Sequence, residues 1–429
     1  MSASPPPERP APSETGPPST SPSPSFRRAL ASRPFLLLWT SQLISQSGDY
    51  IFDVALLWLV LETTGSVFDV TLAVVATIVP TVVLGPVLGV YVDRWPRRTI
   101  LIGTNVAEGV LVATLSGLVL AHAADLELIL AIVFSLGVGA QFVRVASNAM
   151  VPQTVAVHDL TTANSLLSFS SSSTQVVGLS IGGIVVALFG VDLPIAYDAL
   201  TFFVAAAIVT VIATTVGRPE PLAEGGSHRF VDQFAEGFRY VVGQRYLLEL
   251  IALGLVVNFA GNAAFALWAP YADRVLHGGA ATYGFLGAMI AVGAIVGAVV
   301  VGKVNVRPIA GPLLFAGLFG FGGFVIGLGL TRSIPTALAE AFGVGFLTAV
   351  INIPLLTAVQ ARVPARLMGR AMSVLLGLIL AAAPFGAFFA GSLAIATSIE
   401  FVYVAAGVLV LATGAVGLVL MREVRALTY

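Results

Sequence analysis

Residues 35–62 read FLLLWTSQLISQSGDYIFDVALLWLVLE, a stretch long and apolar enough to cross a bilayer that still contains two amides and two carboxylates. Those four residues recur at steps of 4, 3 and 4, so a helix places them on one polar stripe: Gln42, Gln46, Asp49 and Asp53. A carboxylate near the middle of a bilayer costs about 2.5–3.5 kcal/mol, and is kept where it faces a protein interior or a water-filled cavity. The stripe therefore predicts a polar pathway through a membrane protein. The alternative is that Asp49 or Asp53 bonds to a neighbouring helix for structural reasons.

The composition is that of a polytopic membrane protein. Of the 429 residues, 57% are hydrophobic and 10% are charged, whereas soluble domains carry roughly 25% charged residues. Because there is no cysteine and the four histidines are scattered, we expect no disulfide, no metal site and no thiol catalysis. The formal net charge of −1 gives no reason to expect nucleic acid as a partner.

Twelve hydrophobic runs have the roughly 20-residue length that a hydrocarbon core of about 30 Å requires. We expect spans at 34–62, 69–92, 99–121, 126–150, 162–190, 193–216, 246–272, 282–303, 308–330, 335–360, 366–393 and 397–421. With both chain ends on one side, only Arg274 and Arg332 fall in the opposite loops. The positive-inside rule therefore places both termini in the cytoplasm, with the protein in the plasma (inner) membrane.

The predicted fold is all-α, with twelve transmembrane helices in two six-helix halves. The expected divisions are a disordered cytoplasmic tail at 1–33, a first bundle at 34–216, a cytoplasmic linker at 217–245, a second bundle at 246–421 and a short cytoplasmic tail at 422–429. Within the linker, four apolar residues share one helical face and predict an amphipathic helix on the inner membrane surface: Phe230, Phe234, Phe238 and Val241.

The loop after the second span carries the charge cluster Gly89-Val-Tyr-Val-Asp93-Arg94-Trp-Pro-Arg97-Arg98. A carboxylate among three arginines at a membrane boundary is suited to an ionic lock, and the plain alternative is a stop-transfer cluster. In this loop of a twelve-span chain, the stretch resembles the Gly-x-x-x-Asp-Arg-x-x-Arg-Arg signature of the major facilitator superfamily. The resemblance implies the fold of that superfamily and a gate at the cytoplasmic side.

Three further stretches resemble the drug:proton antiporter-3 branch, which includes macrolide efflux proteins and siderophore exporters: residues 198–202, 236–240 and 359–373. The similarity covers roughly residues 35–422. The chain departs from antiporter signatures at Leu179, where a proline would follow Gly178, and at Val133, where many drug antiporters have an arginine.

Arg144 is the one basic residue inside a predicted span and away from its ends, so we expect a partner at similar depth. Glu108 and Asp93 are the candidates, and snorkelling of Arg144 to the inner surface is the alternative. We assign six residues to the cytoplasmic gate: Gly89, Asp93, Arg94, Arg97, Arg98 and Arg144.

The resemblance implies a central cavity lined mainly by the first, fourth, seventh and tenth spans. Gly48-Asp49 in the first span has a counterpart in Gly261-Asn262 of the seventh, and such duplication predicts a site near midplane between the halves. The candidate cavity residues are Gln42, Gln46, Asn148, Asn258, Asn262, Trp268, Glu340 and Asn352, and the proton-coupling candidates are Asp49, Asp53 and Glu108. A wide apolar wall with few polar groups suits a large amphipathic ligand better than a sugar. Each asparagine could instead bond to a neighbouring helix.

Two other patterns receive structural interpretations. The serines of residues 168–173 are interpreted as a packing and bending feature in preference to a substrate wall. Residues 297–304, GAVVVGKV, match most of a phosphate-loop pattern, but Val304 replaces the Ser or Thr that would hold magnesium. We therefore expect no ATP and no other cofactor, with a proton gradient as the energy source.

The sequence thus predicts a monomeric secondary active exporter of amphipathic organic compounds, of multidrug or macrolide type, working by proton antiport and alternating access. Desolvation favours the neutral form of a carboxyl group and contact with water favours the ionised form, so Asp49 or Asp53 would carry the proton. One alternative is a dedicated exporter of a siderophore, lysolipid or other metabolite. The rival of another class is a non-transporting membrane sensor or scaffold. An enzyme is not expected, because neither a histidine pair nor a serine–lysine dyad is apparent.

Overall fold

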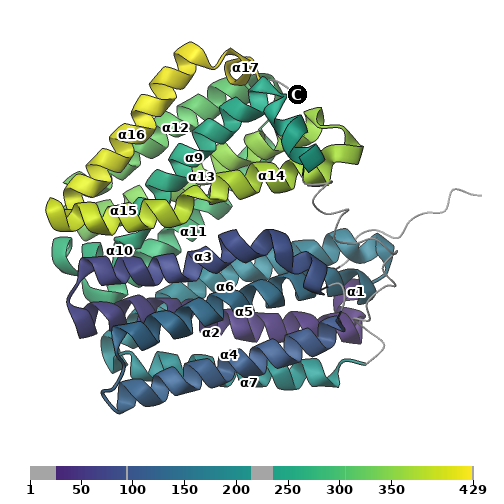
Figure 1. Cartoon of the computed structure of the whole chain (residues 1–429), viewed down its shortest axis with the longest axis vertical. Helices are drawn as coiled ribbons and strands as arrows, with labels where there is room; N and C mark the ends of the chain where they lie inside the picture. Colours follow the sequence, from purple (N-terminus) through teal and green to yellow (C-terminus); the bar gives the residue numbers. More distant parts are fainter. Residues whose placement is uncertain (1–25, 93–94, 214–234, 305, 428–429) are drawn as a thin grey trace, which may run out of the picture.

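Twelve helices long and apolar enough to cross a membrane occur in the computed structural model, which describes residues 26–92, 95–213, 235–304 and 306–427. The first six are α2 (Arg33–Thr64), α3 (Val67–Val92), α4 (Arg97–Leu120), α5 (Leu126–Met150), α6 (Leu160–Phe189) and α7 (Asp192–Val211). The others are α9 (Arg245–Ala266), α11 (Gly279–Lys303), α12 (Ala310–Leu330), α13 (Ile334–Arg362), the pair α14 (Met368–Leu380) and α15 (Ala382–Ala396), and α16 (Ile399–Leu420). Figure 1 shows the two sets as two groups. The predicted fold class is confirmed.

Helices are the natural form of these segments because lipid offers no hydrogen bonds, so every backbone group must be satisfied within the segment. The longest, α2, has 32 residues, and it ends where Gly65 adopts a φ of 63° and donates its N–H to the carbonyl of Leu61. A residue without a Cβ takes that left-handed conformation at little cost. The chain then turns directly into α3.

Two of the predicted spans are broken by prolines, which the sequence analysis did not anticipate. The seventh span stops at Ala266 and continues through α10 (Trp268–Pro270) and a π-helical turn, η3 (Tyr271–Val275). The eleventh is divided at Ala381 into α14 and α15. In each case a proline stands four residues after the last helical position, Pro270 after Ala266 and Pro384 after Leu380. Proline has no N–H to give to that carbonyl and its ring crowds it, so the helix ends there.

The two groups of helices touch mainly through two helix pairs. In α6 and α11, Gly183 and Gly284 bring the backbones together: a Cβ at position 284 would lie 2.3 Å from the carbonyl oxygen of Leu179. In α3 and α15, the rings of Phe68 and Phe388 meet edge to face, with centroids 5.6 Å apart. These contacts lie at one end of the bundle, and the groups diverge toward the end where α1 (Phe26–Ala31) lies (Figure 1).

The side chain of Arg274 adds a polar link at the touching end. Its guanidinium, on the π-helical turn η3, donates to the carbonyl oxygen of Gly65 at the end of α2. The second group of helices therefore caps the C-terminal end of a helix in the first group, where orphan carbonyls need donors.

The linker helix packs against the start of α14, and its predicted position along the membrane surface stays a prediction. Residues 235–242 are helical, while Phe230 and Phe234 lie outside the described residues. A Cβ at Gly237 would lie 2.8 Å from the carbonyl oxygen of Arg370, and Glu236 pairs with Arg370 and, at 3.4 Å, with Arg366. Val241 is buried whereas Phe238 is 44% exposed, so the two side chains do not form one membrane-facing surface.

Candidate functional site

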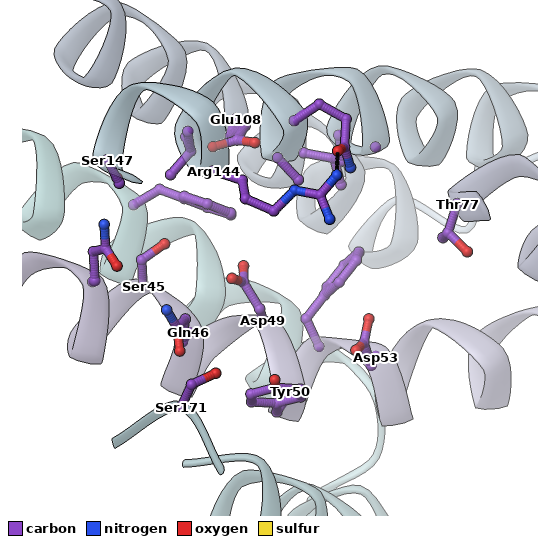
Figure 2. Close-up of a pocket in the computed structure, with 18 of the residues that line it drawn as sticks. Ser45, Gln46, Asp49, Tyr50, Asp53, Thr77, Glu108, Arg144, Ser147 and Ser171 are labelled. Carbon is purple, nitrogen blue, oxygen red and sulfur yellow. Dashed lines mark hydrogen bonds between the residues drawn. The ribbon is translucent and has the colours of Figure 1, made fainter. Parts of the chain in front are cut away.

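A cavity of about 750 Å³ lies within the first group of helices and is lined by residues of all six of its spans. All four residues of the polar stripe line it, because α2 turns that face inward: Gln42, Gln46, Asp49 and Asp53. Asn148 of α5 and Glu108 of α4 line it as well. Figure 2 shows Asp49 and Asp53 projecting from one helix face toward Arg144 on the opposite wall.

Four carboxyl groups face this cavity. Asp49 and Asp53 come from α2, Glu108 from α4 and Asp198 from α7. Glu108 is only 3% exposed and packs against Gly139 of α5. Within the described part of the chain, no three or more acidic or histidine side chains gather closely enough to hold a metal ion. The four acids thus line one cavity without forming a metal-binding cluster.

Asp198 is not among the predicted site residues, although a carboxylate inside a predicted span is itself a signal. Asp198 is 1% exposed, and Thr201 donates to its Oδ1 at 3.2 Å. Its Oδ2 is buried and has no hydrogen-bond partner among the described residues.

Arg144 is the basic side chain among the cavity residues, and its partner is an amide. Its guanidinium donates to Oε1 of Gln141 on the same helix, while Nε2 of Gln141 donates to Thr81 of α3 at 2.7 Å. Arg144 and Glu108 are both described and no ion pair joins them, so the predicted pairing of Arg144 with Glu108 is wrong. The other predicted partner, Asp93, lies outside the described residues. Arg144 therefore presents its charge to the cavity.

Part of the serine run forms a cavity wall, contrary to its interpretation as a packing feature. Ser168, Ser171 and Ser172 line the cavity. Ser170 accepts a hydrogen bond from the indole of Trp39 at 2.8 Å. A helix that carries several consecutive hydroxyls necessarily directs some of them inward, which the one-sided interpretation missed.

The candidates from the seventh and tenth spans do not join this cavity. Asn258, Asn262 and Asn352 line a separate cavity of about 220 Å³ among α9, α12, α13 and α14. Each amide donates to the carbonyl four residues earlier in its own helix, at 2.9–3.2 Å. In this form of the protein, where the halves diverge, the candidate residues of the two halves thus line different cavities.

Two further candidates of the second group have other surroundings. Trp268 is 2% exposed and its ring packs near that of Phe265, with centroids 6.3 Å apart. Glu340 packs against Gly327 of α12, where a Cβ would lie 2.3 Å from its Oε1. Neither side chain lines either of these two cavities.

The predicted gate is only partly within the described residues. Asp93 and Arg94 lie outside them, Gly89 is in the last turn of α3, and Arg97 is the first residue of α4. Arg98 donates to the carbonyls of Thr210 and Ile212, at 2.6 and 2.9 Å, and so caps the C-terminal end of α7. Its contacts among the described residues thus stay within the first group of helices.

The family follows from comparison with known proteins. The family model described as transmembrane secretion effector matches residues 25–427. The chain belongs to the major facilitator superfamily. The resemblance to its drug:proton antiporter-3 branch is confirmed, and the chain is a multi-pass membrane protein.

Two of the curated relatives of the chain are named as efflux proteins. Macrolide efflux protein A of Streptococcus pyogenes is 23% identical over 236 residues, which are 54% of this chain and 58% of that protein. The multidrug efflux pump Tap of Mycobacterium tuberculosis is 24% identical over 395 residues, covering 90% of this chain and 92% of the pump. The alignment with Tap therefore includes nearly all the described helices.

Solved transporters share the fold at low sequence identity. A bacterial homologue of the human lysosomal transporter Spinster, in an inward-facing and occupied conformation, is 16% identical with a TM-score of 0.68, covering 91% of this chain and 97% of that chain. A D-xylose–proton symporter is 14% identical with a TM-score of 0.67, covering 91% and 99%. The likeness to these structures shows that the chain shares their fold.

Proposed function

We propose that the protein is a secondary active exporter of amphipathic organic compounds, driven by proton antiport. The observation that carries the proposal is the cavity of about 750 Å³ with Asp49 and Asp53 on one wall. Pockets for drug-sized ligands are commonly about 300–1,000 Å³, so this cavity has room for such a molecule. The names of the relatives, a macrolide efflux protein and a multidrug efflux pump, support the same direction of transport.

Ligand and protons would compete for the same carboxyl groups. The cavity contains four acids and one arginine among its lining residues, so a cationic or donor-rich ligand finds acceptors there. When such a ligand leaves and the acids are closed off from water, the neutral protonated forms are favoured, because unpaired carboxylates are costly to bury. Asp49 and Asp53 would thus hold either a proton or a ligand, which is the requirement for antiport.

Alternating access would come from rocking the two groups of helices about their contacts. They meet at the end opposite α1, through the α6–α11 and α3–α15 pairs. We propose that both termini are cytoplasmic, as the distribution of Lys and Arg favours, so that this form faces inward. In this proposal the exporter works as a monomer, uses no ATP and returns to the inward-facing form with protons bound.

The test is substrate-evoked proton movement in proteoliposomes with an imposed pH gradient and a trapped pH-sensitive dye. Tetraphenylphosphonium serves as the permanently charged cationic probe, and a macrolide serves as the second probe. Wild-type protein should move protons when at least one probe is added, and Asp49→Asn or Asp53→Asn should reduce that movement at least tenfold. Glu62→Gln is the matched control, since Glu62 lies on the same helix and accepts from Trp58 at 2.7 Å, outside the cavity.

Each outcome has a distinct meaning. If only one of the two variants loses proton movement, that aspartate is the coupling residue and the other shapes the cavity. If a metabolite such as a siderophore or lysolipid triggers proton movement while neither probe does so, the substrate range of the exporter is narrow. If wild-type protein moves neither protons nor probe, a sensor or scaffold becomes the better description and the proposal is abandoned.

A further inference from the structure

Asp198 is the buried acid of the cavity for which the proposed function has no role. It stands on α7, is 1% exposed and belongs to the lining of the same cavity as Asp49. The hydroxyl of Thr201 donates both to the backbone carbonyl of Asp198, at 2.8 Å, and to its Oδ1, at 3.2 Å. That shared donor leaves Oδ2 buried without a partner among the described residues.

The position of Asp198 is fixed by a glycine beside Asp49. A Cβ at Gly48 would lie 2.3 Å from Oδ1 of Asp198 and 2.2 Å from Oγ1 of Thr201. The carboxyl group of Asp198 therefore occupies the space that a side chain at position 48 would fill. It is held against the backbone of α2 at the residue immediately before Asp49.

Acids predominate among the charged groups around Asp198. From α2, Asp49 and Asp53 act on it electrostatically, and from α4 so does Glu108. The third helix packed on α7 is α6, which contains no titratable side chain. The arginine of α4 that reaches α7, Arg98, binds the last carbonyls of that helix, more than three turns away from Asp198.

We propose that Asp198 is a second proton-binding group of the cavity, which titrates as a coupled pair with Asp49 across Gly48. The inference rests on the proposed proton antiport and names a further residue for it. Two nearby carboxyls cannot both ionise readily unless a cation binds to them, and the guanidinium of Arg144 bonds to Gln141 instead, so the pair retains a proton when the cavity is empty. A cationic ligand beside Asp49 offsets the repulsion, both groups ionise, and the proton held by the pair leaves to water.

The experiment counts protons released when tetraphenylphosphonium binds to purified full-length protein in weakly buffered detergent solution. This probe has no titratable group, so every proton detected comes from the protein. Asp198→Asn keeps the size of the side chain and mimics the protonated acid. We expect wild-type protein to release protons on binding, and Asp198→Asn to release at least twofold fewer per bound probe.

The pH dependence of binding gives an independent readout. By linkage, the slope of the logarithm of the affinity against pH equals the number of protons displaced, so it should be lower in Asp198→Asn by about one. Glu249→Gln is the matched control, because Glu249 is also buried but lies on α9, where it accepts from Arg245 and from the N–H of Val424, both at 3.1 Å. This control should leave both readouts unchanged.

If Asp198→Asn does not fold, Thr201→Val replaces it. This change removes the hydroxyl donor but retains the acid, so the proton on the pair should be held more tightly and be released only at higher pH. Wild-type release with equal release from Asp198→Asn, or an unchanged pH profile in Thr201→Val, overturns the role of Asp198 and leaves the proposed antiport intact. No release from wild-type protein overturns both.

Discussion

Asp198 fills the space that a side chain would need at Gly48, with its Oδ1 placed 2.3 Å from where a Cβ at that position would lie. The contact joins α7 to α2 at the level of Asp49, within the helix whose polar stripe lines the cavity. Packing and electrostatics are therefore linked at one point. A methyl group at position 48 would disturb both.

Gly48→Ala should destabilise the protein by about 1–3 kcal/mol, because the added methyl group collides with Asp198 and with the hydroxyl of Thr201. Thermal unfolding in detergent measures the effect. Gly103→Ala on α4 is the control, since nothing lies within 4 Å of a Cβ there. Equal melting temperatures for the two variants would show that α7 adjusts freely and that the contact is not tight.

Arg144→Gln should shift the pH dependence of tetraphenylphosphonium binding upward by about one unit. The arginine charge faces acids across the cavity and favours their ionised forms, so removing it lets protons compete to higher pH. Arg144→Lys should stay close to wild type in this respect. Arg332→Gln, at an exposed ion pair with Glu400, is the neutral comparison. A midpoint that does not move in Arg144→Gln would mean that Arg144 is screened from the acids.

Arg274→Gln should make the touching end of the two halves open more often. The guanidinium donates to the carbonyl of Gly65 across the interface, and a hydrogen bond to a charged group contributes about 1.5–3 kcal/mol. Because the chain has no cysteine, Thr71→Cys supplies a single reporter at a fully buried site against Gly391 of α15. Thiol labelling should accelerate roughly tenfold when Arg274→Gln is added, since each 1.4 kcal/mol is a factor of ten.

The matched background for that experiment is Thr71→Cys with Arg332→Gln, which removes an exposed charge elsewhere. Labelling that is equally slow in both backgrounds would mean that the apolar contacts alone keep this end closed. Faster labelling in both would indicate a general loss of stability, which circular dichroism or unfolding in detergent would reveal.

The polar stripe could be located from the sequence because it depends on one helix only. The steps between Gln42, Gln46, Asp49 and Asp53 determine a shared face whatever packs against it. The same reasoning identified the spans, whose length and hydropathy are local properties. It was also sufficient to find the resemblance to the superfamily, since the motif residues are contiguous.

Asp198 shows where such reasoning ends. Its helical neighbours are apolar or small, so periodicity gives it no stripe, and its importance comes from α2 passing beside it in space. The partner of Arg144 was misjudged for another reason. Gln141, an amide three residues earlier, lies within helical reach of Arg144, whereas both predicted partners were acidic residues.

The breaks after Ala266 and Leu380 agree with the effect of proline on a helix, but proline positions alone do not predict them, because α3 continues past Pro80 and α13 past Pro354. Each precedes a proline by four residues, which is the position at which proline removes a helical hydrogen bond. The division of the cavity candidates between two spaces was not readable, because it depends on how far the two groups of helices have separated. The periodicity of a sequence indicates which residues of a helix face inward. It does not indicate how far the two groups of helices are separated.

All the residues that line the cavity of about 750 Å³ come from α2 to α7, so the two halves of the chain would have different roles in transport. The first half of the chain would bind the substrate. The second half would move relative to the first and so open or close the cavity. Exchanging the second half for that of a relative should then alter the speed of the cycle and leave the choice of cargo unchanged. Substitutions in the second half would then change the transport rate, and substitutions in the first half would change the substrate specificity.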